Sequence, residues 1–317
     1  MSISIAQRAP VYSVESIAAA MSRLDEDSPP SLMRLYRRML ETGPERFSVK
    51  PSRVPDMDQV KADLPNFSKA LDSVFRQIAL CVDTKDDLEI APICLVGPPG
   101  IGKTRFAKSL AKLLCTGYEF ISMNSMTAGW ILSGAAPTWH GAKPGKVFDT
   151  LVHKEFKNPV VVIDEIDKAS GAGQYDPLGA LYTLLEKETS RAFVDEFAEI
   201  PIDAGRVIWV STANDLRSIP DPILSRMMVF DVPAPTPDEA RVICAAIYRE
   251  IRDAHAWGLK FPNTPSEEVL DALIHVAPRE VNQVLINAFG GAKMDGRDEL
   301  LASDFPVPES KKRRIGF

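Results

Sequence analysis

Short apolar runs alternate with helical patterns along the middle of the chain. Segments with apolar residues three and four positions apart lie between runs that are rich in β-branched and aromatic residues, as in strands buried on both faces. This alternation indicates an α/β fold with a parallel five-stranded sheet between helices. The strand-like runs are residues 90–96, 118–121, 160–163, 207–211 and 228–230.

Residues 1–65 have a different pattern and are predicted to be an N-terminal accessory segment. They hold two short helical patterns, at 14–24 and 32–40, followed by a polar stretch with four prolines that predicts a linker. The second helical pattern carries an apolar stripe. We expect this stripe to pack on the main domain or on a neighbouring subunit.

The rest of the chain is predicted to form two domains. Residues 66–232 contain all five strand-like runs and begin with a helix at 70–79, so they form the α/β domain. Residues 233–317 are purely helical in pattern and predict a small helical domain with a C-terminal tail. Its helices are expected at 237–254, 266–275 and 279–289.

Composition and charge exclude several classes of protein. The chain has 317 residues, 45% of them hydrophobic, which is enough for a sizeable core, and its net charge of −6 gives no overall basic surface for nucleic acid. The basic run 311–314 is expected to be a solvated terminal charge run, with an acidic partner or nucleic acid as the alternative. No apolar run has the length of a membrane span. The four cysteines lack metal-ligand spacing and the N-terminus lacks a signal-peptide core, so we expect a cytoplasmic protein.

An octapeptide after the first strand-like run carries the first candidate chemistry. Residues 97–104 fit the phosphate-binding pattern G-x-x-x-x-G-K-[ST] and lie between a strand and a helix, a context that a simple Gly-rich turn does not explain. Glycines let backbone N–H groups surround phosphate oxygens, and the helix N-terminus favours negative charge. Lys103 is expected to reach the β- and γ-phosphates of ATP, and the Thr104 hydroxyl to bind Mg²⁺. The predicted nucleotide-binding residues are Gly97, Pro98, Pro99, Gly100, Ile101, Gly102, Lys103, Thr104 and Arg105.

Two carboxylates follow the strand-like run at 160–163. The carboxyl ends of parallel strands face the crevice in which ligands of open α/β sheets bind. We expect Asp164 to hold Mg²⁺ through water and Glu165 to polarise the water that attacks ATP. A solvated acidic strand end is the alternative interpretation.

Three polar residues further along the chain complete the candidate site. Asn214 ends the run that starts at 207, and a strand beside that of Asp164 would place its amide near the γ-phosphate; alternatively it caps the next turn. Arg226 ends a helical segment and could stabilise charge on the transferred phosphate, or it could act only as a helix-dipole partner or in a surface salt bridge. Arg279 opens a later helix, from which it could swing onto the nucleotide.

Together these residues resemble the AAA+ ATPase family over about residues 66–303. The resemblance implies a P-loop NTPase core followed by a small helical lid domain. It also implies that Asn214 is sensor 1, that Arg226 is an arginine finger for a neighbouring subunit's nucleotide, and that Arg279 is sensor 2. The catalytic residues expected on this basis are Lys103, Asp164, Glu165, Asn214, Arg226 and Arg279.

A more specific resemblance concerns the ATPase module of Lon proteases. Residues 138–146 are similar to the first pore loop of Lon, and residues 164–168 and 212–227 follow the Lon pattern too. The resemblance implies that Trp139 and His140, where Lon commonly has an aromatic–aliphatic pair, contact a polypeptide substrate. A buried aromatic that anchors the loop is the alternative for Trp139, although the loop's glycines favour mobility.

The sequence also departs from Lon. Ser225 stands where Lon usually has an acidic residue before the finger arginine. Lon continues into a protease domain with a Ser–Lys dyad and has a large substrate-binding domain, and these 317 residues contain neither. We therefore expect a motor without proteolytic activity of its own.

The expected function is an ATP-dependent protein unfolding or remodelling motor. A finger that acts in trans implies a homo-oligomeric ring, with a hexamer expected, and the ring could serve a separate partner protein or protease. Two alternatives stay open: a DNA-associated AAA+ factor, against which the net acidity and the aromatic loop count, and a nucleotide-state switch that does not translocate. We expect no nucleic-acid partner and no membrane association. The final residues 315–317, Ile-Gly-Phe, predict either docking to a partner or packing against the lid or an adjacent subunit.

Overall fold

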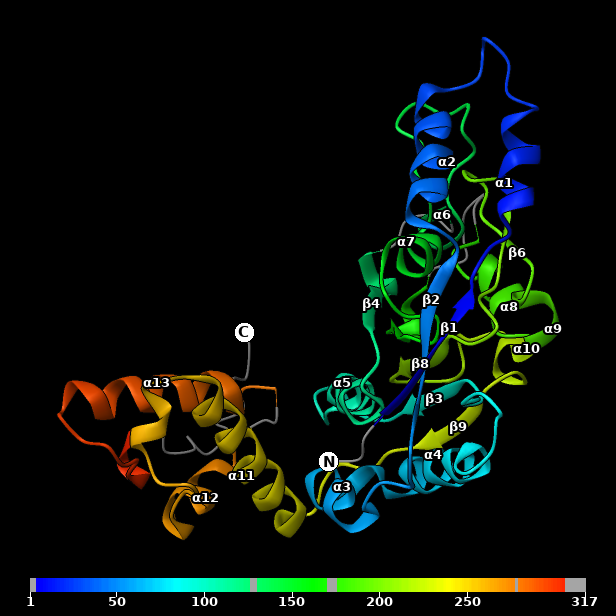
Figure 1. The fold of residues 1–317 in the computed structure, drawn as a ribbon. Coiled ribbons are helices and arrows are strands. Elements are labelled where there is room, and N and C mark those ends of the chain that lie inside the picture. Colours follow the sequence, from blue (N-terminus) through cyan, green and yellow to red (C-terminus); the bar gives the residue numbers. More distant parts are fainter. Residues whose placement is uncertain (1–3, 126–129, 170–175, 277–278, 306–317) are drawn as a thin grey trace, which may run out of the picture. The chain divides into compact units, whose positions relative to one another are not determined.

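The computed structural model describes residues 4–125, 130–169, 176–276 and 279–305, so the predicted features of the tail lie outside the described residues. The chain divides into two compact units (Figure 1). The first contains the residues up to 57, 69–97 and 103–231, and the second contains 58–68, 98–102 and the residues from 232 onward. The domain limits at 65 and 232 stay a prediction.

A five-stranded parallel sheet forms the centre of the first unit, which confirms the predicted fold class. Strands β5 and β8 are apolar and buried along almost their whole length, as expected for a sheet flanked by helices. The ladder of β3 begins at Ile93 and not at residue 90, because the preceding Pro92 has no N–H to donate. The strand order is β4 (Tyr118–Ser122), β5 (Val160–Asp164), β8 (Ile208–Ala213), β3 (Ile93–Val96) and β9 (Met228–Asp231).

Helices flank this sheet (Figure 1). Short helices come after three of its strands in the chain: α6 after β4, α8 and α9 after β5, and α10 after β8. Helix α4 buries the apolar stripe predicted at 70–79, and α5 buries the stripe of the segment after the phosphate-binding loop. A small antiparallel pair, β6 (Phe193–Val194) with β7 (Pro201–Ile202), precedes β8. The helices of this part are α4 (Ser68–Cys81), α5 (Lys103–Leu114), α6 (Trp130–Ser133), α7 (Lys146–His153), α8 (Gly179–Leu184), α9 (Lys187–Ser190) and α10 (Asp221–Leu224).

The N-terminal segment differs from the prediction of two helices and a linker. Strand β1 (Ser4–Pro10) pairs antiparallel with β2 (Glu45–Pro51), and helices α1 (Val14–Met21) and α2 (Pro30–Thr42) lie between them in the chain. The polar stretch therefore provides a strand, and α3 (Met57–Asp63) follows it. The stripe of α2 packs into the core of the first unit, where the Tyr36 hydroxyl donates to the Ala198 carbonyl at 2.8 Å.

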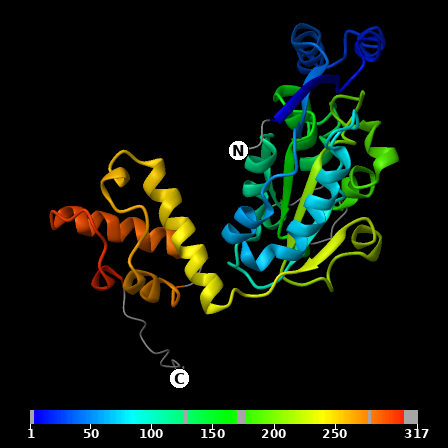
Figure 2. The same cartoon turned by 60° about the horizontal axis from the view of Figure 1, so that its bottom comes forward.

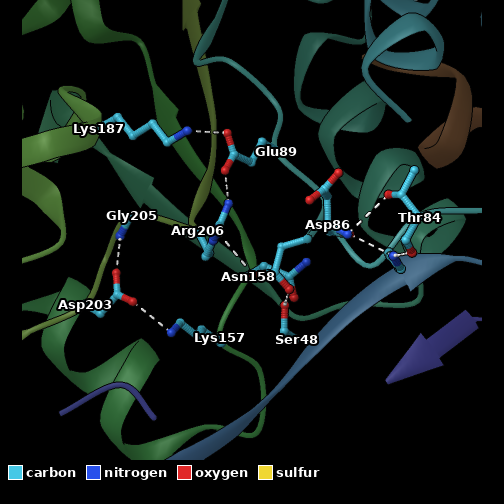
Figure 3. Close-up of polar contacts among 12 residues, drawn as sticks. Ser48, Thr84, Asp86, Glu89, Lys157, Asn158, Lys187, Asp203, Gly205 and Arg206 are labelled. Carbon is cyan, nitrogen blue, oxygen red and sulfur yellow. Dashed lines mark hydrogen bonds and ion pairs between the residues drawn. The ribbon is translucent and has the colours of Figure 1, made fainter. Parts of the chain in front are cut away.

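Polar side chains hold β2 in place. Lys50 is buried, 8% exposed, and its ammonium group donates to the carbonyls of Cys81, Thr84 and Asp86 at 3.1, 2.8 and 2.7 Å. The Asn158 side chain accepts from the Val49 N–H at 3.0 Å and donates to the Val49 carbonyl at 2.7 Å. Figure 3 shows Ser48 and Asn158 beside the Lys157–Asp203 pair and the contacts of Glu89 with Lys187 and Arg206. These contacts make β2 an integral part of the first unit.

The second unit contains a small helical cluster (Figure 2). Helix α11 starts at a capping box in which the Thr236 and Glu239 side chains each accept from the other's backbone N–H. Aromatic rings form its core, with Tyr248 stacked on Phe289 at 5.2 Å and Phe261 edge-on to Phe289 at 4.8 Å. Within the described residues, no helix has both the length and the apolar character that crossing a membrane needs. The helices of this cluster are α11 (Pro237–Ala254), α12 (Glu267–Leu273) and α13 (Val281–Met294).

The buried ammonium group of Lys50 gives the first prediction. We expect Lys50→Met to lower the free energy of unfolding by about 2–4 kcal/mol, because three backbone carbonyl groups lose a charged donor. Urea denaturation followed by circular dichroism measures this change. Lys85→Met, at an exposed position, is the matched control and should change the free energy by less than about 0.5 kcal/mol. Equal stability of the two variants would contradict this role for Lys50.

Candidate functional site

The candidate phosphate-binding loop connects the end of β3 to the start of α5. Gly100 and Gly102 have φ angles of +82° and +99°, a region that residues with a Cβ rarely adopt. Lys103 is the first residue of α5 and is 8% exposed. Its ammonium group donates to the Gly97 carbonyl at 2.6 Å and to the Asn214 side-chain oxygen at 3.0 Å.

Hydroxyl groups surround the carboxylate of Asp164 at the end of β5. The Thr104 hydroxyl donates to Asp164 Oδ1 at 3.2 Å, and the Thr212 hydroxyl donates to the same oxygen at 2.8 Å. Thr212 also accepts from the backbone N–H of Glu165 at 2.9 Å. Glu165 itself has left-handed backbone angles, with φ 54° and ψ 48°. Thr212 thus fixes both acidic residues, although its sequence position suggested no role of its own.

The order of the strands explains how these groups meet. Strand β8 lies between β5 and β3, in parallel register with both. The residues that follow these three strands therefore emerge side by side at one edge of the sheet. This edge brings together five of the predicted residues, namely Lys103, Thr104, Asp164, Glu165 and Asn214.

Burial sets the electrostatics of Lys103. It lowers the pKa of the ammonium group, and the negative charges of Asp167, Asp164 and Glu165 partly offset this effect. Asp167 was not singled out from the sequence, although its side chain is almost completely buried. Among the described residues its carboxylate oxygens accept no hydrogen bond, and Lys168 is 3.5 Å away. An interior acidic side chain one turn after a strand end is the signal that could have identified it.

The two predicted arginines lie in different surroundings. Arg226 pairs with Glu186 of the same chain at 3.0 Å and donates to the Pro222 carbonyl at 2.5 Å, and no described contact joins it to Lys103 or Asp164. The side chain of Arg279 is 71% exposed. Gly100 and Arg279 both belong to the second unit. They lie close together, since a Cβ atom added to Gly100 would be 3.7 Å from the Arg279 Cβ. Arg279 therefore borders the candidate phosphate-binding loop.

Trp139 and His140 lie on a loop between α6 and α7. The Trp139 N–H donates to the Ala136 carbonyl and the Ala142 N–H donates to the Trp139 carbonyl, at 3.0 and 3.1 Å, which forms a tight turn. The Trp139 side chain is 48% exposed and His140 is exposed too. Exposure of this size does not fit the alternative of a fully buried anchor.

One buried carboxylate closes the base of this loop. Asp195 accepts from the Gly145 N–H at 2.8 Å through one oxygen, and from the Phe197 and Ala198 N–H groups at 3.0 Å through the other. An added Cβ on Gly134, where φ is +83°, would lie 2.5 Å from Asp195, so only glycine fits there. The loop base is therefore fixed to the segment that follows β6.

The lysine, hydroxyl and acidic groups at this edge of the sheet belong to a region that matches a known protein family. Residues 93–233, which hold all five sheet strands and the residues around Asp164, match the model of the ATPase family associated with various cellular activities (AAA). Residues 93–233 are an AAA ATPase domain. This domain accounts for the lysine, hydroxyl and acidic groups gathered at one edge of the sheet.

Relatives of the AAA ATPase domain include several Lon proteases. The peroxisomal Lon protease homolog 2 of Zea mays is 35% identical over 60% of this chain, the mitochondrial Lon protease homolog of Schizosaccharomyces pombe is 38% identical over 57%, and Lon protease 4 of Sorangium cellulosum is 30% identical over 71%. The matched regions are only 21%, 17% and 31% of the lengths of those proteins. The fold is similar to that of Hsp104 from S. cerevisiae in a complex with casein, with a TM-score of 0.61 and 14% identity over 76% of this chain and 48% of that chain.

Thr212 gives a prediction about nucleotide binding by the AAA ATPase domain. We expect Thr212→Val, which keeps the shape of the side chain, to weaken binding of the Mg²⁺–nucleotide complex about tenfold, because Asp164 and the Glu165 N–H both lose a partner. Thr212→Ser retains the hydroxyl and is the matched control. Titration with a fluorescent ATP analogue, with and without Mg²⁺, measures both affinities. Unchanged Mg²⁺-dependent binding in the valine variant would refute this role.

Asp195 gives a prediction about pH dependence. Burial raises the pKa of Asp195 to about 6, although the three N–H donors favour the ionised carboxylate. In the unfolded chain this carboxyl group ionises near its ordinary pKa of 3.8. The folded protein therefore holds a proton that the unfolded chain releases between about pH 4 and pH 6. The free energy of unfolding should fall as the pH rises through this window, by up to about 3 kcal/mol.

Asp195→Asn removes this titration and provides the comparison. The difference in unfolding free energy between wild type and variant should change between about pH 4 and pH 6 and be constant above that window. Chemical denaturation at a series of pH values measures it. Parallel profiles across the window would show that the pKa of Asp195 is not raised.

Proposed function

We propose that this protein is an ATP-hydrolysing motor that unfolds or remodels a protein client. The observation that carries the proposal is Trp139, an exposed aromatic side chain on a loop whose base is fixed within the first unit. The AAA ATPase domain that contains this loop is the second part of such a motor. An exposed flat side chain can hold an extended polypeptide by packing, without reading its sequence.

The residues around Asp164 fit ATP hydrolysis with Mg²⁺. Thr104 and Asp164 offer hard oxygen atoms of the kind that Mg²⁺ prefers, so these two residues would hold it. When bound, Mg²⁺ would neutralise charge on the phosphate oxygens. In this proposal Lys103 moves from the Gly97 carbonyl to the phosphates, and Asn214 positions the γ-phosphate. Glu165, which Thr212 orients through its backbone N–H, polarises the attacking water.

Arg226 supports action on a neighbouring subunit. Its described contacts within the chain are with Glu186 and Pro222, away from the groups that surround Asp164. An arginine that serves a catalytic site without reaching the one in its own chain must act in trans, and repeated use of one interface closes a ring. We therefore propose a homo-oligomeric ring, with a hexamer as the expected form. Arg279, beside Gly100, is proposed to contact the nucleotide within its own subunit.

The Lon relatives guide the proposal about clients. Their names describe proteases, whereas the present chain matches only a fraction of their lengths. We propose that this chain shares with them the binding and movement of polypeptide, and that a separate protein or protease receives the client. The decisive observation would be polypeptide-stimulated ATP hydrolysis that depends on Trp139.

Replacing Trp139 tests the proposal directly. We expect Trp139→Ala to keep basal ATP hydrolysis. Its stimulation by an unfolded protein should fall at least about tenfold, because the aromatic contact with the client is lost. Trp139→Phe keeps an aromatic ring and is the matched control, which should retain most of the stimulation. A phosphate-release assay with carboxymethylated casein measures both quantities.

Glu165→Gln completes this experiment. It should bind ATP normally and lose hydrolysis with or without the unfolded protein, because no carboxylate positions the water. Full stimulation of Trp139→Ala would contradict a role in client binding, and wild-type turnover of Glu165→Gln would contradict the catalytic assignment. Each half of the proposal can therefore fail by itself.

A further inference from the structure

A hollow of about 480 Å³ lies beside Trp139 in the first unit. It is formed by helix α6, the loop of Trp139, strand β6 and the start of α8. Trp130 and Trp139 contribute indole rings to its lining. Its volume lies in the range of sites that hold a small ligand or a few side chains.

The hollow has an apolar wall that is accessible from outside. Phe193 in the lining is buried, whereas Val194, next in the chain, is 51% exposed. Trp139, which also lines the hollow, is 48% exposed. An exposed valine and tryptophan that face the same hollow form a surface suited to a large apolar side chain.

Two carboxylates give the same hollow a negative charge. Asp176 and Glu196 belong to its lining, and among the described residues that line it there is no lysine, arginine or histidine. Hydrogen bonds hold both: Asp176 Oδ1 accepts from the Leu178 N–H at 2.9 Å, and Glu196 Oε1 accepts from the Ser133 hydroxyl at 3.2 Å. Each carboxylate keeps a second oxygen, and no ion pair from the described residues is formed with either. The charge is therefore available to a ligand.

We propose that this hollow, formed by Trp130, Trp139, Asp176, Phe193, Val194 and Glu196, binds client segments in which a large apolar side chain neighbours a lysine or arginine. The proposal rests on the proposed function, since it names the client chemistry that the loop of Trp139 prefers. Charge complementarity selects the cation, and the indole rings add a favourable cation–π interaction. A segment with aspartate or glutamate at the same position meets repulsion instead.

The test uses two synthetic peptides that differ only in charge. One carries Lys–Phe pairs separated by Gly and Ser, and the other carries Glu–Phe pairs. Because Trp130 and Trp139 line the hollow and the peptides contain no tryptophan, protein tryptophan fluorescence reports binding without any ATPase measurement. We expect the Lys–Phe peptide to bind at least about tenfold more tightly than the Glu–Phe peptide.

Conservative variants then locate the effect. Glu196→Gln should weaken the Lys–Phe peptide about fivefold, and the double variant with Asp176→Asn should remove the preference for the basic peptide. Glu188→Gln removes an exposed carboxylate outside the hollow and should change neither affinity. Equal binding of the two peptides to the wild type, or an unchanged preference in the double variant, would overturn the proposal.

Three further outcomes distinguish this proposal from the proposed motor function and from binding of the chain's own C-terminal segment. If the peptides bind without charge preference while unfolded casein still stimulates ATP hydrolysis, the hollow is not selective and the motor stands. If the basic peptide binds selectively but no polypeptide stimulates hydrolysis, the binding site stands and the motor fails. Binding that appears only after removal of residues 311–317, a basic segment ending in Ile-Gly-Phe, would make the chain's own end the occupant and overturn the assignment to clients.

Discussion

A buried ammonium group constrains the edge of the sheet at which Lys103, Asp164 and Asn214 meet. Burying Lys103 is unfavourable unless hydrogen-bond acceptors and negative charges compensate it. The Gly97 carbonyl and the Asn214 side-chain oxygen accept its hydrogen bonds, and the carboxylates of Asp167 and Asp164 contribute negative charge. Asn214 lies 111 residues from Lys103 in the chain, and these groups meet because β3, β8 and β5 are neighbours in parallel register. The strand order is thus a condition for stabilising one cation.

The loop of Trp139 combines a rigid base with an exposed tip. Asp195 fixes Gly145 to the segment after β6, whereas Trp139 and His140 remain on the surface. Functional loops commonly have this construction, because a scaffold positions the side chains that a partner meets. The hollow beside Trp139 extends this principle, since its apolar wall and its two carboxylates come from elements on both sides of Asp195. The shape and charge of the exposed tip therefore depend on Asp195, a buried group.

Local patterns predicted the elements better than the contacts between distant segments. The five sheet strands and the meeting of Lys103, Thr104 and Asp164 at one edge of the sheet follow from apolar runs and one motif, so they could be predicted. The pairing of β1 with β2 could not, because its inward residues include Lys50, whose charge is stabilised by backbone carbonyls that no sequence pattern reveals. Thr212 and Asp195 were missed for a related reason. Their roles depend on partners from other segments, brought near only by folding.

The pairing of β1 with β2 also affects how the N-terminal region can change during evolution or engineering. Because Pro10 lies opposite Glu45, the ends of the α1–α2 excursion are held together by the strands and not by the excursion itself. Lengthening a loop whose ends are already joined adds little closure entropy. The exposed connection from Asp25 to Ser28 could therefore accept an inserted reporter domain without unfolding the first unit. Such an insert would lie beside Pro137 and Thr138, which share a hollow with this connection, so it would report on the loop of Trp139 at close range.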